Sequence, residues 1–414
     1  MKIAVIGGGG KISSAVIYEM LDTVKDIPLS FALYGRNDKK ISDTLTISKR
    51  FAGENAAVYR EKELDDALRG ADVVFYCATY GCEDCGNYRS MGIANGAYIM
   101  SIGEKMTSLC PDAHLAVLTN PPDIPLAAVK MRFGIDKLIG LCNAPIFNRR
   151  VTASFLGCGE DDIVMHEIGV NHEYWFYEIT KDGEDIYDLL REKMVKEYST
   201  DKIRSETKGY LGEFHKDFPE WSLGFNNNVK LMELCGFMPG PVGGSNRYKG
   251  LPVVLKDMWA IATRPTAADF EELLDPDLTN EQIKKKAARC AAGIPTYAAR
   301  VLASLARNDG KEHHVLALNN GALPGYPDDV LLQMSCGISR DGIRRPDLSK
   351  IDEYIMGVLS SRITQNHLMA RALADGNEML MRRALLCYPE RVECHEVEDF
   401  LAHHKSVEPF IQLD

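Results

Sequence analysis

A cysteine and a histidine, each beside an asparagine, are the residues of this sequence best suited to hold a metal ion. Cys142 and Asn143 lie in the segment Leu138–Pro145, and Asn171 and His172 follow thirty residues later. A structural zinc site needs four protein ligands, which one cysteine and one histidine do not supply. A thiolate and an imidazole can instead hold a divalent metal ion whose remaining positions are open. The pair therefore predicts an open metal site.

The N-terminus carries a glycine-rich turn of the kind that binds dinucleotides. Gly7, Gly8, Gly9 and Gly10 directly follow an apolar stretch and precede a helical pattern. We expect Gly7 to permit a tight turn and Gly9 to let backbone N–H groups approach a pyrophosphate at the helix start. Ile12 stands where the usual motif has its third glycine. The turn predicts a redox cofactor beside the metal ion.

The end of the second expected strand bears on the choice between NAD and NADP. An NAD site usually has Asp or Glu there, to bind the ribose 2′-hydroxyl. This strand ends Leu33-Tyr34-Gly35-Arg36-Asn37, with no acid at that position. Arg36 could meet a 2′-phosphate; alternatively it is solvated or stacks on adenine, and Asp38 binds the ribose. The sequence leaves NAD and NADP both open.

Short apolar stretches alternate with helical patterns in the first part of the chain, which indicates a parallel sheet with crossover helices. One more apolar strand, Lys137–Cys142, ends at the Cys-Asn pair. Ligands bind at the carboxyl ends of strands in such open sheets, so this is where a site is expected. The other expected strands are Ile3–Ile6, Phe31–Tyr34, Val73–Cys77, Tyr98–Ile102 and Leu115–Leu118.

The regular alternation ends near residue 165, which predicts two joined domains. Residues 1–165 form a dinucleotide-binding Rossmann domain in this prediction, and residues 166–414 form an α+β substrate and metal domain. The expected fold class is thus α/β, with the active site at the shared interface. The glycine-rich turn and the Asn-Pro turn at Asn120-Pro121 also occur in lactate and malate dehydrogenases, which the chain resembles in architecture. Expected elements of the second part are the strands Val164–Val170 and Trp175–Ile179 and the helices Ile186–Tyr198, Asn280–Arg307, Ile351–Ala374 and Asn377–Leu386.

Composition excludes several classes of protein. A net charge of −11 argues against nucleic-acid binding, which needs a basic surface, and against an anionic membrane surface. No apolar run reaches the roughly 20 residues that span a bilayer. The N-terminus enters a strand at once, so no signal peptide is expected. The 11 cysteines are then reduced thiols, and the expected location is the cytoplasm.

From end to end the sequence resembles the NAD- and metal-dependent glycosidases of glycoside hydrolase family 4. The Cys-Asn and Asn-His pairs at this separation are the specific part of the resemblance. Their Cys-Asn-x-Pro form is most similar to the 6-phospho-β-glucosidase branch. The other shared motifs are the glycine-rich start, Ala67–Val74, Thr119–Pro121, Asn319–Gly321 and Ala384–Pro389.

The resemblance implies a cofactor-based reaction whose net result is hydrolysis. The nicotinamide takes a hydride from sugar C3, a base removes the acidified C2 proton, and the C1 leaving group departs by elimination. Water then adds, and the cofactor returns the hydride; this family is a known exception to two-carboxylate catalysis. A Lewis acid stabilises the enolate charge, and Mn²⁺ or another divalent metal suits such a site.

The resemblance also implies roles for individual residues. Cys142 and His172 would be the metal ligands, and Tyr210 would be the base, with Asn143 as a second catalytic residue. Tyr174 and Tyr177 are the next candidates for the base. Asn120 would contact the cofactor and the substrate, and Asn143 and Asn171 would bind the substrate; the expected partners are a small-molecule glycoside and further copies of the chain, as a dimer or tetramer.

The sequence departs from the family at two places that concern the substrate. The branch with the Cys-Asn-x-Pro form has an Arg-Gly-Gly stretch after the fourth strand, where this chain reads Ala78-Thr79-Tyr80-Gly81. The Gly-Asp-Arg-His stretch of the α-glucosidase and galacturonidase branches is also missing; Lys208–His215 stands there. The expected substrate is a glucoside-type sugar, and its phosphorylation or acidity and its anomer stay open.

Two other functions compete with the glycosidase. The first is an NAD(P)-dependent 2-hydroxy-acid dehydrogenase, which needs an Asp-x-x-Arg pair and a catalytic histidine. Near Ile146–Arg150 the arginines occur without the aspartate, and Cys142 would have no role in the dehydrogenase reaction. The second is a non-catalytic nucleotide sensor, which would bind the cofactor without metal dependence or turnover.

Overall fold

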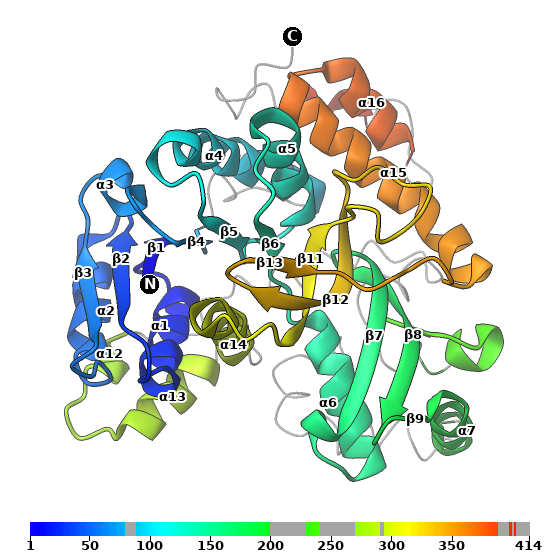
Figure 1. Ribbon diagram of the computed structural model, residues 1–414, viewed down its shortest axis with the longest axis horizontal. Coiled ribbons are helices and arrows are strands. Elements are labelled where there is room, and N and C mark those ends of the chain that lie inside the picture. Colours follow the sequence, from blue (N-terminus) through cyan, green and yellow to red (C-terminus); the bar gives the residue numbers. More distant parts are fainter. Residues whose placement is uncertain are drawn as a thin grey trace.

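One mixed β-sheet of 13 strands runs through the described part of the chain (Figure 1). The computed structural model describes residues 1–78, 88–198, 229, 231–240, 270–289, 294–387, 397–399 and 401–402. Along the main path of the sheet the strands follow the order β10-β8-β7-β12-β11-β6-β5-β4-β1-β2-β3. The sheet is parallel from β3 to β6 and antiparallel from β6 to β10.

The parallel half has the strand order 3-2-1-4-5-6 of a dinucleotide-binding Rossmann fold. Its order reverses between β1 and β4, and the glycine-rich turn leaves the sheet at that place. All six strands point the same way, so their carboxyl ends share one edge. The strands are β1 (Lys2–Ile6), β2 (Leu29–Tyr34), β3 (Ala56–Arg60), β4 (Val73–Tyr76), β5 (His114–Val117) and β6 (Leu138–Gly140).

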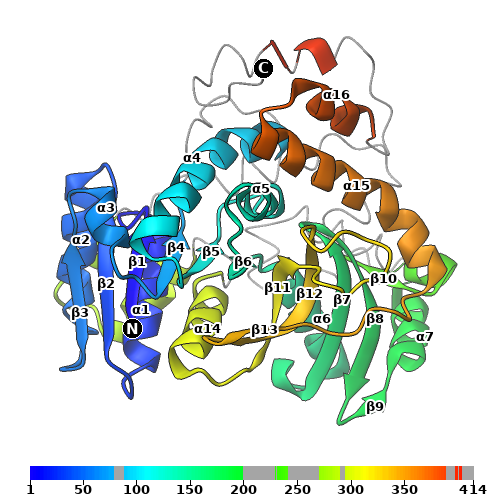
Figure 2. The same cartoon turned by 45° about the horizontal axis from the view of Figure 1, so that its top comes forward.

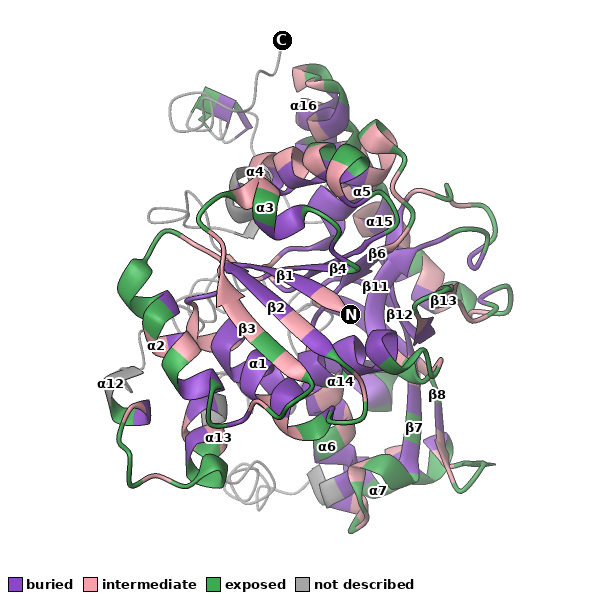
Figure 3. Ribbon diagram, turned by 60° about the vertical axis from the view of Figure 1, so that its left-hand side comes forward, coloured by how far each residue is buried: buried purple, intermediate pink, exposed green. Residues whose placement is uncertain are grey.

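The apolar runs of the parallel strands form two cores, one on each face of the sheet. In β1, Ile3 and Val5 pack into one core, and Ala4 and Ile6 into the other. Side chains alternate between the faces of a strand, so a strand covered on both sides is apolar throughout. Figure 3 shows β1 and β4 mostly buried at the centre of the molecule, whereas the edge strand β3 is intermediate to exposed.

The antiparallel half extends the sheet beyond β6. Leu316 of β11 pairs with Gly140 of β6, so the two halves share backbone hydrogen bonds. A hairpin of β7 and β8 follows on the far side of β12. The strands are β7 (Ile163–Val170), β8 (Glu173–Lys181), β9 (Glu184–Asp185), β10 (Met238–Pro239), β11 (Glu312–Leu318), β12 (Leu331–Ser339) and β13 (Gly342–Arg344).

Helices cover both faces of the sheet. Figure 2 shows α4, α5, α15 and α16 above the sheet, with α1 and α14 below it. Helices α13 and α14 come from the second half of the sequence but pack against α1 of the first. The helices are α1 (Lys11–Thr23), α2 (Asp38–Ser48), α3 (Leu64–Leu68), α4 (Tyr88–Leu109), α5 (Asp123–Phe133), α6 (Ala144–Leu156), η1 (Glu160–Asp162), α7 (Tyr187–Tyr198), α12 (Phe270–Leu273), α13 (Asn280–Arg289), α14 (Ile294–Arg307), α15 (Glu353–Asp375) and α16 (Glu378–Leu386).

The α/β fold class is confirmed, but one expected strand is wrong. Tyr98–Ile102 lies within α4, where the buried residues Asn95, Ile99, Ile102 and Met106 recur at helical spacing. A short apolar run fits a strand and a buried helix equally well, so length has to decide. The prediction also omitted β3, β11 and β12.

Several expected boundaries differ from the observed ones. The helix expected over Asn280–Arg307 is described as two helices, α13 and α14, and residues 290–293 between them lie outside the described residues. Strand β6 ends at Gly140, two residues before Cys142. The division at residues 165 and 166 stays a prediction, because the sheet continues through both halves.

Candidate active site at the carboxyl edge of the sheet

The glycine-rich turn packs as a cradle against β2 and β4. Gly7 has a φ of 91°, and a Cβ there would lie 2.9 Å from the Ala78 backbone nitrogen. Gly7 and Gly8 donate their N–H groups to the Tyr34 carbonyl at 2.9 and 3.0 Å, which holds the turn on the end of β2. The tight turn expected at Gly7 is therefore observed.

The next glycines leave no room for side chains between the turn and its neighbours. A Cβ at Gly8 would lie 2.8 Å from Leu33 Cβ, and one at Gly9 would lie 3.0 Å from Lys40 Cβ. Gly10 is the N-cap of α1, and Ile12 lies half-buried in its first turn. A bare backbone before a helix N-terminus suits a pyrophosphate, so these residues fit a dinucleotide.

Two basic side chains lie near the end of β2. Arg36 is exposed and follows the strand by two residues. Asp38, the alternative ribose ligand, accepts a hydrogen bond from Arg60 at 2.5 Å. Asn37 caps α2 by accepting the Lys40 N–H at 3.0 Å. The nearest acid is thus already paired with an arginine.

Cys142 lies just past the end of β6 and is almost completely buried, at 4% exposure. Burial raises the pKa of its thiol to about 12, although the Ala144 backbone N–H and the Asn171 amide both lower it. The Asn171 amide therefore lies beside the sulfur, although its contact falls short of a regular hydrogen bond. The thiol keeps its proton until a cation displaces it.

His172 occupies the tip of the hairpin between β7 and β8. Its φ of 65° is in the left-handed region, which costs energy for a residue with a Cβ. Burial lowers the pKa of its imidazole to about 4, so the ring is neutral at pH 7. A neutral imidazole is the form that binds metal ions.

These residues fit an open metal site. Asn171, at 5% exposure, directly precedes His172, and neither polar atom of its side chain has a hydrogen-bond partner among the described residues. Within the same residues no group of three or more His, Cys, Asp or Glu side chains could enclose an ion. One thiol and one imidazole leave most positions to other ligands, as catalytic metal sites do.

The other two predicted asparagines lie at the same edge of the sheet. Asn120 follows β5, the neighbour of β6, and is joined to Pro121 by a cis peptide bond. Its Oδ1 is buried, with no hydrogen-bond partner in the described part of the chain. Asn143 directly precedes α6, and its carbonyl accepts the Phe147 N–H at 3.3 Å. The fold thus brings Asn120, Asn143 and Asn171 to the edge where Cys142 lies.

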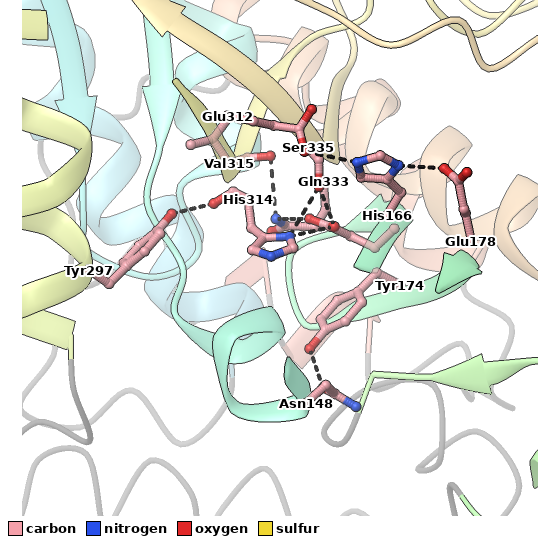
Figure 4. Close-up of polar contacts among 11 residues, drawn as sticks. Asn148, His166, Tyr174, Glu178, Tyr297, Glu312, His314, Val315, Gln333 and Ser335 are labelled. Atoms are coloured by element: carbon pink, nitrogen blue, oxygen red, sulfur yellow. Dashed lines mark hydrogen bonds and ion pairs between the residues drawn. The ribbon is translucent and has the colours of Figure 1, made fainter. Parts of the chain in front are cut away.

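Tyr210, the predicted base, lies outside the described residues. Of the two alternatives, Tyr174 donates its hydroxyl to Asn148 Oδ1 at 3.1 Å in the core (Figure 4). Burial raises the pKa of Tyr174 and of Tyr177 above the ordinary value for a phenol. Both shifts oppose formation of a phenolate, which favours neither residue as a base.

A buried polar network joins β7 of the hairpin to β11 and β12 (Figure 4). Glu167 is fully buried; its carboxyl accepts from Gln333 Nε2 at 3.0 Å and from Ser335 Oγ at 2.9 Å, and it lies 2.7 Å from His314 Nδ1. The coulombic and hydrogen-bonding effects of these partners hold the Glu167 pKa below its usual value against the strong opposing effect of desolvation. Tyr297 donates its hydroxyl to the His314 carbonyl.

The sequence analysis did not identify Asp123, whose carboxyl group contacts the hairpin turn. It accepts the Asn171 N–H at 3.1 Å and an N–H of the Asn366 side chain at 2.8 Å. These partners lie 48 and 243 residues further along the chain. The local signal was an acid directly after Asn120-Pro121-Pro122, but nothing in the sequence shows what it contacts.

The second half of the chain shows which family the protein belongs to. Residues 168–390, over half of the chain, match the family 4 glycosyl hydrolase C-terminal domain. Residues 1–137 match the NAD binding domain of lactate/malate dehydrogenases. The chain belongs to glycosyl hydrolase family 4, so the predicted family and the predicted class of enzyme, a glycosidase, are confirmed.

Individual relatives match along nearly the whole chain. A 6-phospho-β-glucosidase of Thermotoga maritima is 22% identical, over 97% of each chain. A 6-phospho-α-glucosidase from gut microorganisms, solved with NAD and glucose-6-phosphate, has a TM-score of 0.78 at 17% identity and covers 99% of both chains. A Thermotoga maritima 6-phospho-β-glucosidase, solved with manganese, NAD⁺ and glucose-6-phosphate, has a TM-score of 0.73 at 18% identity over 100% of both chains.

These matches agree with the cofactors predicted from the sequence, because the two solved relatives hold NAD and one of them also holds manganese. The dehydrogenase family model matches only residues 1–137, so this match reflects the shared nucleotide-binding fold. The family match over the catalytic half favours the glycosidase over the dehydrogenase alternative. None of the helices in the described residues is long and apolar enough to cross a membrane.

Proposed function

We propose that this chain is a glycosidase that depends on NAD and a divalent metal ion, and that it cleaves its substrate by oxidation and elimination. The observation that carries the proposal is the placement of Cys142 and the Asn171-His172 turn at the edge where the Rossmann half ends. Sugar C3 is oxidised, C2 loses its proton, the C1 leaving group departs, water adds, and C3 is reduced again. The net reaction is hydrolysis, because the cofactor is regenerated.

The protein's own residues bind and orient the reactants. When bound, NAD accepts a hydride from C3 and returns it, and the metal ion stabilises negative charge on the neighbouring oxygen. Cys142 and the neutral imidazole of His172 would hold the ion, preferably Mn²⁺. The amides of Asn120, Asn143 and Asn171 would bind sugar hydroxyl groups, because each amide both donates and accepts hydrogen bonds.

We further propose that the substrate is a glucoside phosphorylated at O6. The support is the set of relatives, which include both 6-phospho-β-glucosidases and 6-phospho-α-glucosidases at similar identity. Elimination breaks the C1 bond without in-line attack by a nucleophile. We therefore expect both anomers and thioglycosides to be cleaved at the same site.

A panel of aryl glucosides tests the function. Both anomers, their 6-phosphates and a thioglycoside are assayed with NAD, Mn²⁺ and reductant, with lactate and malate as dehydrogenase substrates. We expect turnover of 6-phosphoglucosides that stops with EDTA and returns with Mn²⁺, and a large loss of Mn²⁺ affinity in Cys142→Ser. Full activity of Cys142→Ser in EDTA would contradict the metal site, and oxidation of lactate or malate would favour the dehydrogenase.

Tyr210 is our proposed base for the C2 proton. An unperturbed phenol has a pKa of about 10, and a nearby divalent cation would lower that value. Wild-type turnover in D₂O should give product deuterated at C2. Tyr210→Phe should lose this exchange and most of the turnover while it still binds metal and cofactor. Normal exchange in Tyr210→Phe would assign the base to another residue.

We also propose that the protein forms a dimer or tetramer. Support comes from large apolar side chains exposed outside the cores, such as Leu189 at 61% and Leu234 at 71%. Light scattering coupled to size exclusion measures the mass directly. A monomer at micromolar concentration would contradict this proposal.

A further inference from the structure

The carboxyl group of Asp123 forms a hydrogen bond with the turn that carries His172. Asp123 is the first residue of α5 and is only 2% exposed. Its Oδ2 accepts the Asn171 N–H at 3.1 Å and Asn366 Nδ2–H at 2.8 Å. Its Oδ1 accepts the N–H of Ile124 at 3.0 Å. All three partners donate, so this carboxyl group acts only as an acceptor.

Helix α15 holds the other side of the same turn. Arg362 donates its Nε–H to Glu173 Oε2 at 2.8 Å, and Glu173 is only 4% exposed. Asn366 lies one turn further along α15 and bonds to Asp123. Asn171 and Glu173 flank His172, so α15 is bonded directly to Glu173 and reaches Asn171 through Asp123 of α5. Figure 2 shows α15 lying beside α5.

Asp123, Asn366 and Arg362 form a clamp on the Asn171-His172 turn. The conformation of His172 explains why this clamp is needed. Its backbone is in the left-handed region, which only surrounding structure can maintain for a residue with a Cβ. We propose that Asp123 is a positioning residue, which fixes the Asn171-His172 turn so that the imidazole meets the metal ion held with Cys142. This inference rests on the proposed metal site, and Asp123 acts on it through its hydrogen bond to the turn.

Asp123→Asn is the sharpest test, because it keeps the size of the side chain. The new NH₂ group must face either Ile124 N–H or the two donors from Asn171 and Asn366, so at least one contact is lost in either orientation. Loss of an outer partner of a metal ligand typically weakens metal binding about 10- to 100-fold. We expect the Kd of Mn²⁺, measured by isothermal titration with NAD present, to rise at least about tenfold. The Kd of NAD should change less than about twofold, because the cofactor contacts other residues.

Two further variants keep the test decisive if Asp123→Asn folds poorly. Asn366→Ala removes one donor from the clamp but keeps the Asn171 contact, so we expect a smaller loss of Mn²⁺ affinity, about three- to tenfold. Asn377→Ala removes the N-cap of α16, away from the turn, and serves as a control for lost stability. It should lower the melting temperature while the Kd of Mn²⁺ stays at the wild-type value.

Hydrogen exchange of the Asn171 amide reports on the clamp without any metal. The amide should exchange faster in Asp123→Asn than in wild type or in Asn377→Ala. Wild-type Mn²⁺ affinity in both clamp variants, or an equal loss in Asn377→Ala, would overturn the positioning role. If wild type binds no Mn²⁺, or Cys142→Ser binds it as tightly, the proposed metal site fails, whereas the Asn171 exchange rate still tests the clamp.

Discussion

Burial decides the protonation state of the two residues proposed as metal ligands. It raises the pKa of the Cys142 thiol to about 12 and lowers that of the His172 imidazole to about 4. At neutral pH the pair is therefore uncharged, and a divalent cation has to displace the thiol proton. The Asn171 amide beside the thiol adds a polar group with no acid–base change of its own.

Arg36 is the residue that we expect to decide between NAD and NADP. The nearest acid, Asp38, is already paired with Arg60, and an arginine near this place can bind a 2′-phosphate. Arg36→Ala should raise the Kd of NADP about tenfold, since a hydrogen bond to a charged group contributes about 1.5–3 kcal/mol. The Kd of NAD should change little. Fluorescence titration with both cofactors measures the two values.

Lys39→Ala is the matched control for the cofactor prediction. Lys39 is exposed in the first turn of α2, and its ammonium group is paired with Asp43 at 3.1 Å. Its removal should leave the ratio of the two dissociation constants unchanged. An unchanged ratio in Arg36→Ala as well would mean that Arg36 takes no part in the choice of cofactor.

At the scale of elements, the β7–β8 hairpin positions the site, and close backbone packing shapes it. Gly169 lies two residues before the turn and pairs with Tyr174. A Cβ added to Gly169 would lie 2.2 Å from the Glu173 carbonyl oxygen. A backbone atom cannot move aside as a flexible side chain can. The sequence of the hairpin therefore requires glycine at this position.

Gly169→Ala should destabilise the fold strongly, by about 3 kcal/mol, because the added methyl group forces the two strands apart. Gly357→Ala is the opposite case, since Gly357 is exposed inside α15 and a Cβ added there would meet nothing within 4 Å. Alanine there should stabilise the protein by about 0.5–1 kcal/mol. Urea unfolding of both variants checks the signs. A neutral Gly169→Ala would show that the hairpin can relax.

At the scale of the whole molecule, a histidine ties three strands of the antiparallel half together. His166 of β7 lies 2.6 Å from Glu178 of β8 and 2.8 Å from Glu312 of β11. The hydrogen bond with Glu312 is the largest effect on its pKa, which rises to about 9 against the effect of burial. Since β11 also pairs with β6, the ion pairs of His166 support the junction with the Rossmann half.

Stability should therefore depend on pH through His166. The folded pKa of about 9 lies above the unfolded value of about 6.5. The ion pairs of His166 therefore stabilise the folded state fully below pH 6.5, and this stabilisation weakens as pH rises through 9. His166→Gln should lose about 1–2 kcal/mol at pH 6.5, after discounting for the partly exposed site, and less at pH 9.5. Urea unfolding at several pH values measures the difference.

His313→Gln is the control for this pH dependence. Burial lowers the pKa of His313 to about 4, so this ring is neutral throughout the range from pH 6.5 to 9.5. Its replacement should lower stability by the same amount at both ends of that range. If His166→Gln also lowers the free energy of unfolding by the same amount at both pH values, the charged ion pairs of His166 are contradicted.

The sequence alone determined the Rossmann half and the glycine-rich turn, because each depends on short local patterns in the chain. The pairing of Cys142 with His172 as metal ligands stays a prediction. Periodicity did not separate a strand from a buried helix at Tyr98–Ile102, where only the packing of α4 decides. The clamp of Asp123, Asn366 and Arg362 is likewise a product of tertiary structure. Its hydrogen bonds join residues up to 243 positions apart, and no local pattern encodes a contact made only when α5, α15 and the hairpin pack together.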